Sequence, residues 1–146
     1  EYLGANVSHP EFWIPQLESD QEEVAEWLSH ADVQPEDRLI AIAPLSRENM
    51  KCWPLDRFVA LAQEISQWTA CKIVLLGSCS QEWVVEKFDQ IRGPGLINMV
   101  GKVRLRQLGI LLRQTDLLIA NDSAPIHIAS AMNAPTPPSF SITYSR

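Results

Sequence analysis

Metal-binding and disulfide patterns are missing from this sequence of 146 residues. It contains three cysteines, Cys52, Cys71 and Cys79, without a Cys-x-x-Cys pair, and its three histidines are far apart in the chain. An odd number of cysteines without a spacing pattern is typical of the reducing cytosol, where thiols pack against other side chains. We therefore expect a cytoplasmic protein that holds no metal ion.

Long apolar runs and an excess of positive charge are missing as well. No apolar stretch approaches the length of a transmembrane helix, and the first residues do not form a signal peptide. The net charge of −6, without any basic run, disfavours a nucleic-acid partner. Neither a Gly-x-Gly-x-x-Gly sequence nor a Walker A sequence is present, which disfavours a classical dinucleotide-binding domain or a P-loop site.

The composition that remains is that of a soluble globular domain. Hydrophobic residues make up 46% of the chain and charged residues 21%, and the length suffices to bury a core. Residues 1–20 begin with a stretch that has no clear periodicity and holds two prolines. We expect residues 1–20 to be a linker or crossover from a preceding domain, and residues 21–146 to form one domain that is cut short at its C-terminus.

Apolar runs alternate with helical patterns along the chain. Strands are predicted at residues 39–43, 72–76, 96–100 and 117–120, and helices at 21–30, 54–68, 80–91, 105–114 and from about 123. A fifth strand near residues 135–140 is at best an edge strand, because Pro137 and Pro138 interrupt it. This order predicts an α/β fold: a Rossmann-like parallel sheet with helices on both faces.

Ligands bind such sheets at the carboxyl ends of the strands. The loops after Ala43, Leu76, Val100 and Ala120 should therefore meet at one edge. The polar residues of these loops are Ser46, Arg47, Lys51, Ser78, Glu82, Lys102 and residues 121–127.

The last of these loops is the most informative, because the strand before it leads directly into a helix. A helix N-terminus has unpaired N–H groups and a partial positive charge, which together attract anions. With Asp122 as the N-cap, the free donors are the N–H groups of Ser123, Ala124 and Ile126, and the Ser123 hydroxyl and His127 imidazole lie at the same opening. This pattern fits a phosphate or pyrophosphate, but it equally fits an ordinary helix cap without a ligand.

Four motifs in this order resemble glycosyltransferase family nine, the heptosyltransferases of lipopolysaccharide core assembly. They are Lys51-Cys52-Trp53-Pro54 before a helix, Leu75-Leu76-Gly77 followed by Glu82, Gly101-Lys102 followed by Leu105, and Asn121-Asp122-Ser123 followed by Pro125 and His127. Together they cover residues 39–136. One such motif alone is weak, whereas four in series are fairly specific.

The resemblance implies a GT-B enzyme with two facing Rossmann-like domains, of which this chain is the C-terminal, donor-binding one. It implies a nucleotide-sugar donor, typically ADP-heptose, and a lipid-linked or saccharide acceptor bound through an N-terminal domain that also carries the acidic catalytic residue. No Asp-x-Asp motif occurs, so the enzyme is expected to need neither a metal ion nor a cofactor. The full-length protein is expected in the cytoplasm, peripheral to the inner membrane face.

The resemblance also suggests roles for individual residues, each with a plainer alternative. Lys51 is expected to be catalytic, neutralising the diphosphate as it leaves; the alternative is a solvated surface lysine. Glu82 would bind the ribose hydroxyls, or only favour the first turn of a helix. Val103 would support the adenine, or only pack in the core.

The other expected donor contacts come from Ser46 and from the helix start. Ser123, Ala124 and Ile126 would bind phosphate through their N–H groups, while Asp122 is expected to fix the turn. His127 would donate to a phosphate oxygen, or else be buried and bonded to a carbonyl group. The tryptophans at 53 and 83 are expected to pack rather than stack on a base.

Two other functions stay open at this point. One is a different GT-B enzyme, a transferase or epimerase that uses a UDP-sugar. The other is a nucleotide-binding module that has lost catalysis, which Ala124 favours because it replaces the family's glycine and disfavours positive φ. The preferred base would distinguish the first, and the activity of the full-length protein the second.

Overall fold

The computed structural model describes residues 14–46, 52–68, 70–81, 83–89 and 95–132, together with the backbone of 139–141. The helices are α1 (Glu18–His30), α2 (Leu55–Ile65), α3 (Trp83–Phe88), α4 (Leu105–Arg113) and α5 (Ala124–Ala131), with a 3₁₀ turn η2 (Cys79–Gln81). The strands are β1 (Arg38–Ala43), β2 (Cys71–Leu75), β3 (Leu96–Asn98), β4 (Leu117–Ala120) and β5 (Ser139–Ser141).

In the described residues, five strands form one sheet in the order β3-β2-β1-β4-β5. All of its neighbouring pairs are parallel, which confirms the predicted Rossmann-like α/β fold. The weak fifth strand is present and lies at the edge, as Pro137 and Pro138 led us to expect. The two prolines themselves lie outside the described residues.

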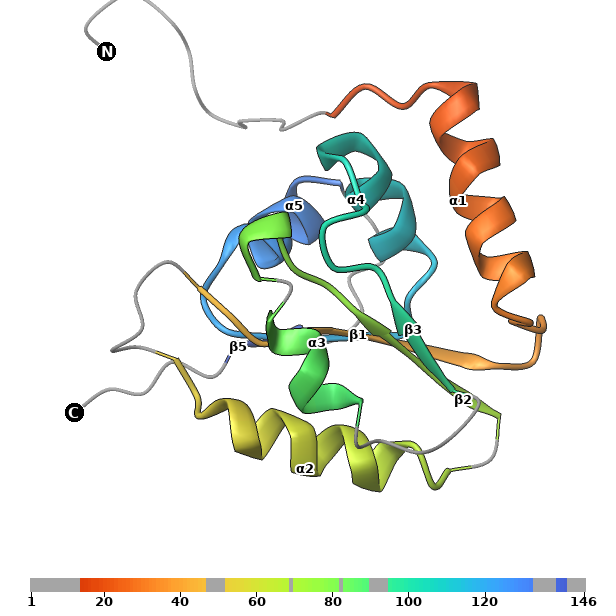
Figure 1. Cartoon of the computed structure of the whole chain (residues 1–146). Helices are drawn as coiled ribbons and strands as arrows, with labels where there is room; N and C mark the ends of the chain where they lie inside the picture. The colour runs from red at the N-terminus through yellow and green to blue at the C-terminus, as the bar shows by residue number, and fades with distance from the viewer. Residues whose placement is uncertain are drawn as a thin grey trace, which may run out of the picture.

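Helices cover both faces of the sheet (Figure 1): α1, α4 and α5 lie on one side, and α2 and α3 on the other. Side chains of a strand alternate between the faces. In β1, Leu39, Ala41 and Ala43 join the core under α1, α4 and α5, whereas Ile40 and Ile42 join the core under α2 and α3. Because both faces are buried, the strand is apolar at every position from Leu39 onward.

The helix predicted over residues 80–91 is wrong in its extent. The structure has the η2 turn and then the short helix α3. The Ser78 N–H donates to Gln81 Oε1 at 3.0 Å, and the Gln81 N–H donates to Ser78 O at 2.9 Å. These two bonds close the turn on itself, so Ser80 does not cap a continuous helix.

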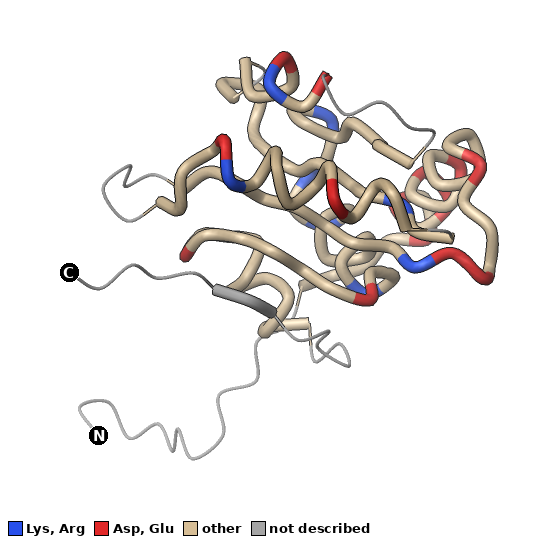
Figure 2. The backbone as a smooth tube through the Cα atoms, turned by 90° about the horizontal axis from the view of Figure 1, so that it is seen from below, with Lys and Arg blue, Asp and Glu red and all other residues tan. Residues whose placement is uncertain are grey.

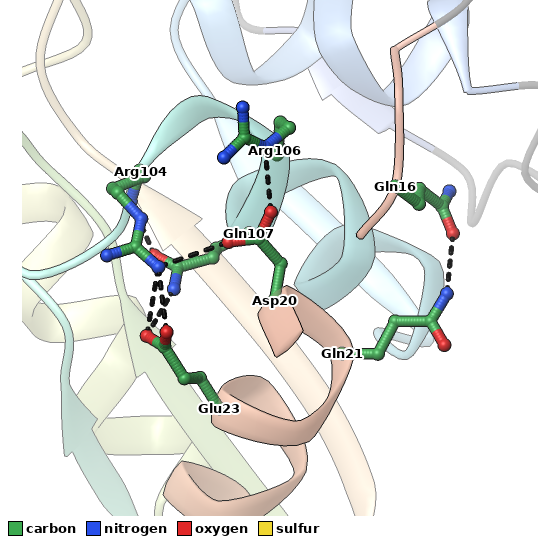
Figure 3. Close-up of polar contacts among 7 residues, drawn as sticks. All are labelled: Gln16, Asp20, Gln21, Glu23, Arg104, Arg106 and Gln107. Atoms are coloured by element: carbon green, nitrogen blue, oxygen red, sulfur yellow. Dashed lines mark hydrogen bonds and ion pairs between the residues drawn. The ribbon is translucent and has the colours of Figure 1, made fainter. Parts of the chain in front are cut away.

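A cluster of charged and amide side chains joins α1 to the start of α4 (Figure 3). The Asp20 carboxylate, 1% exposed, accepts from Arg106 Nε at 2.7 Å and from Arg104 Nη2 at 3.1 Å. Glu23 accepts from Arg104 at 2.9 Å and from Gln107 Nε2 at 2.7 Å, and the buried Gln107 accepts the Arg104 backbone N–H at 2.9 Å. The hydrogen bond from Arg106, opposed by burial, lowers the pKa of Asp20 below its ordinary value.

This pKa shift predicts a pH-dependent contribution to stability. The folded state binds fewer protons at Asp20 than the unfolded state, so the contribution is complete above the ordinary pKa of 3.8 and is lost as pH falls through the lower folded value. Asp20→Asn should therefore lower the urea midpoint at pH 7, and the difference from the wild type should shrink at acidic pH. Unfolding curves over a pH series measure both effects.

The control for this experiment is Glu22→Gln, which removes a carboxylate from an exposed position of the same helix. It should change the urea midpoint little at any pH. An Asp20→Asn difference that stays constant from neutral to acidic pH would contradict the assignment of the effect to the ionised carboxylate.

Candidate functional site

A cavity of about 580 Å³ lies at the carboxyl edge of the sheet. It is lined by Ala43, Leu45, Ser46, Leu76, Gly77, Ser78, Gln81, Val103, Leu105, Leu108, residues 122–125, His127 and Ile128. The chain passes from β1 to β2 on one side and returns to β4 on the other, so this edge holds the topological switch point where such sheets bind ligands. The prediction that the loops after β1, β2, β3 and β4 share one site is confirmed.

The lining differs between the two sides of the cavity. The loops after β1 and β4 contribute Ser46 and the polar residues 122, 123 and 127. The loop after β3 and the start of α4 contribute Val103, Leu105 and Leu108, which are apolar. The loop after β2 adds the polar residues Ser78 and Gln81, so the part of the lining that is apolar throughout is the one from the loop after β3 and the start of α4.

The start of α5 differs from the prediction in its cap. Ser123, not Asp122, is the N-cap residue, with extended backbone angles, and its hydroxyl donates to Asn121 O at 3.0 Å. The Ile126 N–H donates to Ser123 O at 3.1 Å, so it is not a free donor. The Ile126 side chain packs against the core, and this residue does not line the cavity.

Two of the three expected donors remain. Within the part of the chain that the structure describes, the backbone N–H groups of Ser123 and Ala124 have no hydrogen-bond partner. Ala124 is the first residue of α5, and the described non-glycine residues with positive φ are Asp32 and Ala70. The alanine is therefore unstrained, and the conformational objection to it does not arise.

His127 lies at the mouth of the cavity with its imidazole 76% exposed. The alternative of a buried histidine bonded to a carbonyl group is wrong. Its Nε2 is 3.5 Å from Asp122 Oδ1, and the Asp122 side chain is itself 53% exposed. Asp122 thus faces the histidine, and the turn is held by other groups.

The group that holds the turn is Asn121, to which the sequence analysis gave no role of its own. Its side chain is fully buried. Nδ2 donates to Pro44 O, and Oδ1 accepts the Trp53 N–H at 2.9 Å. The position of Asn121 in the sequence could have indicated this role, because a polar side chain directly after a buried strand must find hydrogen-bond partners.

The remaining predicted residues have different outcomes. Ser46 lines the cavity, and its Oγ lies 3.3 Å from Cys52 Sγ. Val103 lines the cavity and also packs against the core, so it contributes to both. Lys51, Glu82 and Arg47 lie outside the described residues.

Of two further loop residues, one lies outside the cavity lining and the other belongs to it. Lys102 does not line the cavity, because its Nζ turns back to donate to Asn98 O at 2.9 Å. Gln81, which we did not single out, does line it. A Cβ at Gly77 would lie 3.1 Å from Gln81 Oε1, so glycine there lets the η2 turn close against the end of β2.

The aromatic and thiol side chains mostly pack. Trp53 contacts Phe58 edge to face at 4.9 Å between ring centroids, as expected of a packing residue, whereas Trp83 is 53% exposed. Cys71 lies in the core, where burial raises the pKa of its thiol, but Cys79 is exposed on η2.

Charge is mixed over the molecule. Figure 2 shows the basic residues interleaved with acidic ones along several elements of the coloured part of the chain. Among the described residues, no group of three or more His, Cys, Asp or Glu side chains is arranged to hold a metal ion. No helix in those residues is long and apolar enough to span a membrane.

Chemically, the polar side of the cavity can hold an oxyanion. The two N–H groups without partners belong to Ser123 and Ala124, which line this side at the N-terminus of α5, and a hydroxyl and an imidazole lie on the same side. The apolar side can hold a flat, uncharged group. The cavity therefore suits a ligand that carries both an anionic group and a flat, uncharged group.

Comparisons with known proteins find relatives of this chain. The model of glycosyltransferase family 9 (heptosyltransferase) matches residues 6–138. Lipopolysaccharide heptosyltransferase 3 of Escherichia coli is 32% identical over 111 residues, which are 74% of this chain and 32% of that protein. Lipopolysaccharide core heptosyltransferase OpsX of Haemophilus influenzae is 24% identical over 136 residues, 92% of this chain and 38% of that protein.

Solved structures show the same fold. A glycosyl transferase family 9 structure from Veillonella parvula superposes with a TM-score of 0.78 at 26% identity, covering 90% of this chain and 38% of the other. The E. coli ADP-heptose lps heptosyltransferase II superposes with a TM-score of 0.68 at 24% identity, covering 89% and 40%. The chain thus spans about a third of the length of the curated relatives it matches.

The exposure of His127 allows its binding role to be tested apart from folding. His127→Ala should change the free energy of unfolding by less than about 0.5 kcal/mol, because the side chain is largely solvated. It should weaken binding of inorganic pyrophosphate about tenfold, the order expected for losing one hydrogen bond to a charged group. Calorimetric titration and urea unfolding measure the two effects.

His30→Ala is the matched control, since this histidine is exposed at the end of α1 and does not line the cavity. It should leave both quantities unchanged. Equal pyrophosphate affinity in the wild type and His127→Ala would remove His127 from the site.

Proposed function

This chain belongs to glycosyltransferase family 9. From this membership we propose that it is the donor-binding domain of a glycosyltransferase. The enzyme would transfer a heptose-like sugar from an ADP-linked donor to a lipopolysaccharide-type acceptor. The observation that carries the proposal is the two-sided cavity at the switch point. It combines unpaired N–H groups of α5 with the apolar surface of Val103, Leu105 and Leu108.

A nucleoside diphosphate matches both sides of this cavity. Its pyrophosphate would lie against Ser123, Ala124 and His127, where the helix N-terminus favours negative charge. Its base would lie against Val103 and its apolar neighbours. The volume of about 580 Å³ is within the range of small-molecule sites.

The same groups would assist the chemical step. When the glycosidic bond breaks, negative charge accumulates on the departing diphosphate, and fixed donors aimed at that charge lower the barrier. The N–H groups of α5 are such donors, and Lys51 would add a full positive charge. The contact of its chain neighbour Cys52 with Ser46, a lining residue, supports this role. Glu82, which follows the lining residue Gln81, would bind the ribose hydroxyls.

Other parts of the reaction would come from outside this chain. The base that activates the acceptor and the acceptor site itself would belong to a second domain, so this chain by itself should bind nucleotide weakly and transfer no sugar. We propose a metal-independent reaction without a cofactor, in a cytoplasmic protein that works at the inner membrane face on a lipid-linked or saccharide acceptor. A nucleic-acid partner is not expected at a net charge of −6.

The donor proposal is tested by titrating the chain with ADP, UDP and GDP. ADP should bind most tightly, and Lys51→Ala should weaken ADP binding at least about tenfold without loss of fold, because a lysine–phosphate contact is charge-assisted. Lys102→Ala is the control: it removes the same charge from the same sheet edge, but from a side chain that turns away from the cavity lining.

The outcomes separate the alternatives. A preference for UDP would assign the chain to a GT-B enzyme that uses UDP-sugars. Equal losses in Lys51→Ala and Lys102→Ala would show only a general effect of charge and reject the role of Lys51. An absence of binding to all three nucleotides would mean either a diverged site or a chain too short to hold one, and titration of the full-length protein would separate these two explanations.

A further inference from the structure

Asn121 occupies a position that neither the donor contacts nor the core explains. It directly follows β4 and precedes the N-cap of α5 by two residues. Its side chain is fully buried, yet both ends of its amide are bonded to backbone groups distant in sequence: Nδ2 to Pro44 O and Oδ1 to the Trp53 N–H, 77 and 68 residues away.

Two of the three segments that meet at Asn121 lead to the polar side of the cavity, and the third begins α2, outside the cavity lining. Pro44 is followed by the lining residues Leu45 and Ser46. Trp53 precedes Pro54, the N-cap of α2, and is itself held against the buried Phe58. The backbone carbonyl of Asn121 accepts the hydroxyl of Ser123, next to the two unpaired N–H groups.

We propose that Asn121 is a positioning residue, whose buried amide fixes the loop after β1, the start of α2 and the start of α5 relative to one another. It thereby holds Ser46 and the N–H groups of Ser123 and Ala124 in a binding geometry before the ligand arrives. Only the identity of the ligand that these groups bind rests on the proposed function. Donor groups gain most when their geometry is fixed in advance, within about 0.5 Å.

The amide is suited to this task by its chemistry. It presents one acceptor and a donor group on the same planar end, matching one N–H and one C=O of the backbone. A carboxylate would place an oxygen against Pro44 O, and an apolar side chain would leave both backbone groups without their partner.

The opposite edge of the same strand pair supplies a matched control. Asp116, just before β4, accepts the Leu39 N–H at 2.8 Å and Arg38 Nη1 at 2.7 Å. Both bonds lower the pKa of the Asp116 carboxyl group, and the bond from the Leu39 N–H has the larger effect. Asp116 thus joins β4 to β1 through a side chain, as Asn121 does, but at the edge away from the cavity.

The first experiment needs no ligand. Amide signals of the wild type, Asn121→Ala and Asp116→Ala are compared by ¹H–¹⁵N NMR. Asn121→Ala should shift the signals of Ser46, Ser123 and Ala124 and speed the hydrogen exchange of the Trp53 N–H, which loses its acceptor, while Asp116→Ala should leave all four unchanged. Unchanged signals in Asn121→Ala would overturn the proposal, whichever nucleotide the cavity binds.

The second experiment separates positioning from general support of the fold, by comparing ADP with adenosine, which lacks the phosphates. In Asn121→Ala, the affinity for ADP should fall by about tenfold or more and that for adenosine by less than about twofold. Asp116→Ala should lower the urea midpoint but keep both affinities. Equal losses for ADP and adenosine in folded Asn121→Ala would overturn the positioning role.

Two provisions keep the test decisive. If Asn121→Ala does not fold, Asn121→Asp replaces it, because the carboxyl group has the same reach and keeps the acceptor for the Trp53 N–H. This variant should show the same effects at smaller size, and wild-type amide signals and wild-type affinities would count against the proposal. If the wild type does not bind ADP, the proposed function fails, while the ligand-free amide signals still decide whether Asn121 positions the turn.

Discussion

The pairing of β1 with β4 is the contact on which the rest of this structure depends. The two strands are in register from Ile40 and Leu117 to Ala43 and Ala120, although 77 residues separate them in the chain. Everything between them forms the crossover that places β2 and β3 on the other side of β1. This arrangement creates the switch point, since the loops after β1 and β4 diverge toward opposite faces and leave room between them.

Polar side chains secure this strand pair at both ends. Asp116 joins the amino end of β4 to β1, and Asn121 joins its carboxyl end to the loops around the cavity. A third polar contact, between Asp20 of α1 and the arginines at the start of α4, acts on the apolar side, because α4 carries Leu105 and Leu108 into the lining. The hydrophobic core supplies the cohesion of the domain, while these bonds determine where the loops lie.

A cavity with a polar and an apolar side would let a small domain bind the proposed nucleotide without a glycine-rich fingerprint. The helix N-terminus provides N–H donors without any charged side chain, and the cost of orienting them is met during folding. The same donors can stabilise a diphosphate more strongly as its charge grows, which is what a leaving-group site requires. Membership of glycosyltransferase family 9 underlies the reaction that we propose for this arrangement, and in that proposal a second domain would complete the site.

The sequence by itself determined the strands, their parallel arrangement and the sheet edge at which the cavity lies. Buried strands such as residues 39–43 read as apolar runs, because a sheet covered on both faces accepts no polar side chain, and the polar residues after them marked the loops. The family motifs added the site residues. The tertiary structure decided the details of the helix starts: Ser123 took the N-cap position, with its hydroxyl bonded to Asn121 O, and Gln81 closed a turn where a helix was predicted to begin. It alone exposed His127 and turned Lys102 away. It also gave Asn121 its hydrogen-bond partners. These bonds span 68 and 77 residues and depend on which distant segments fold together, which a local sequence pattern does not indicate.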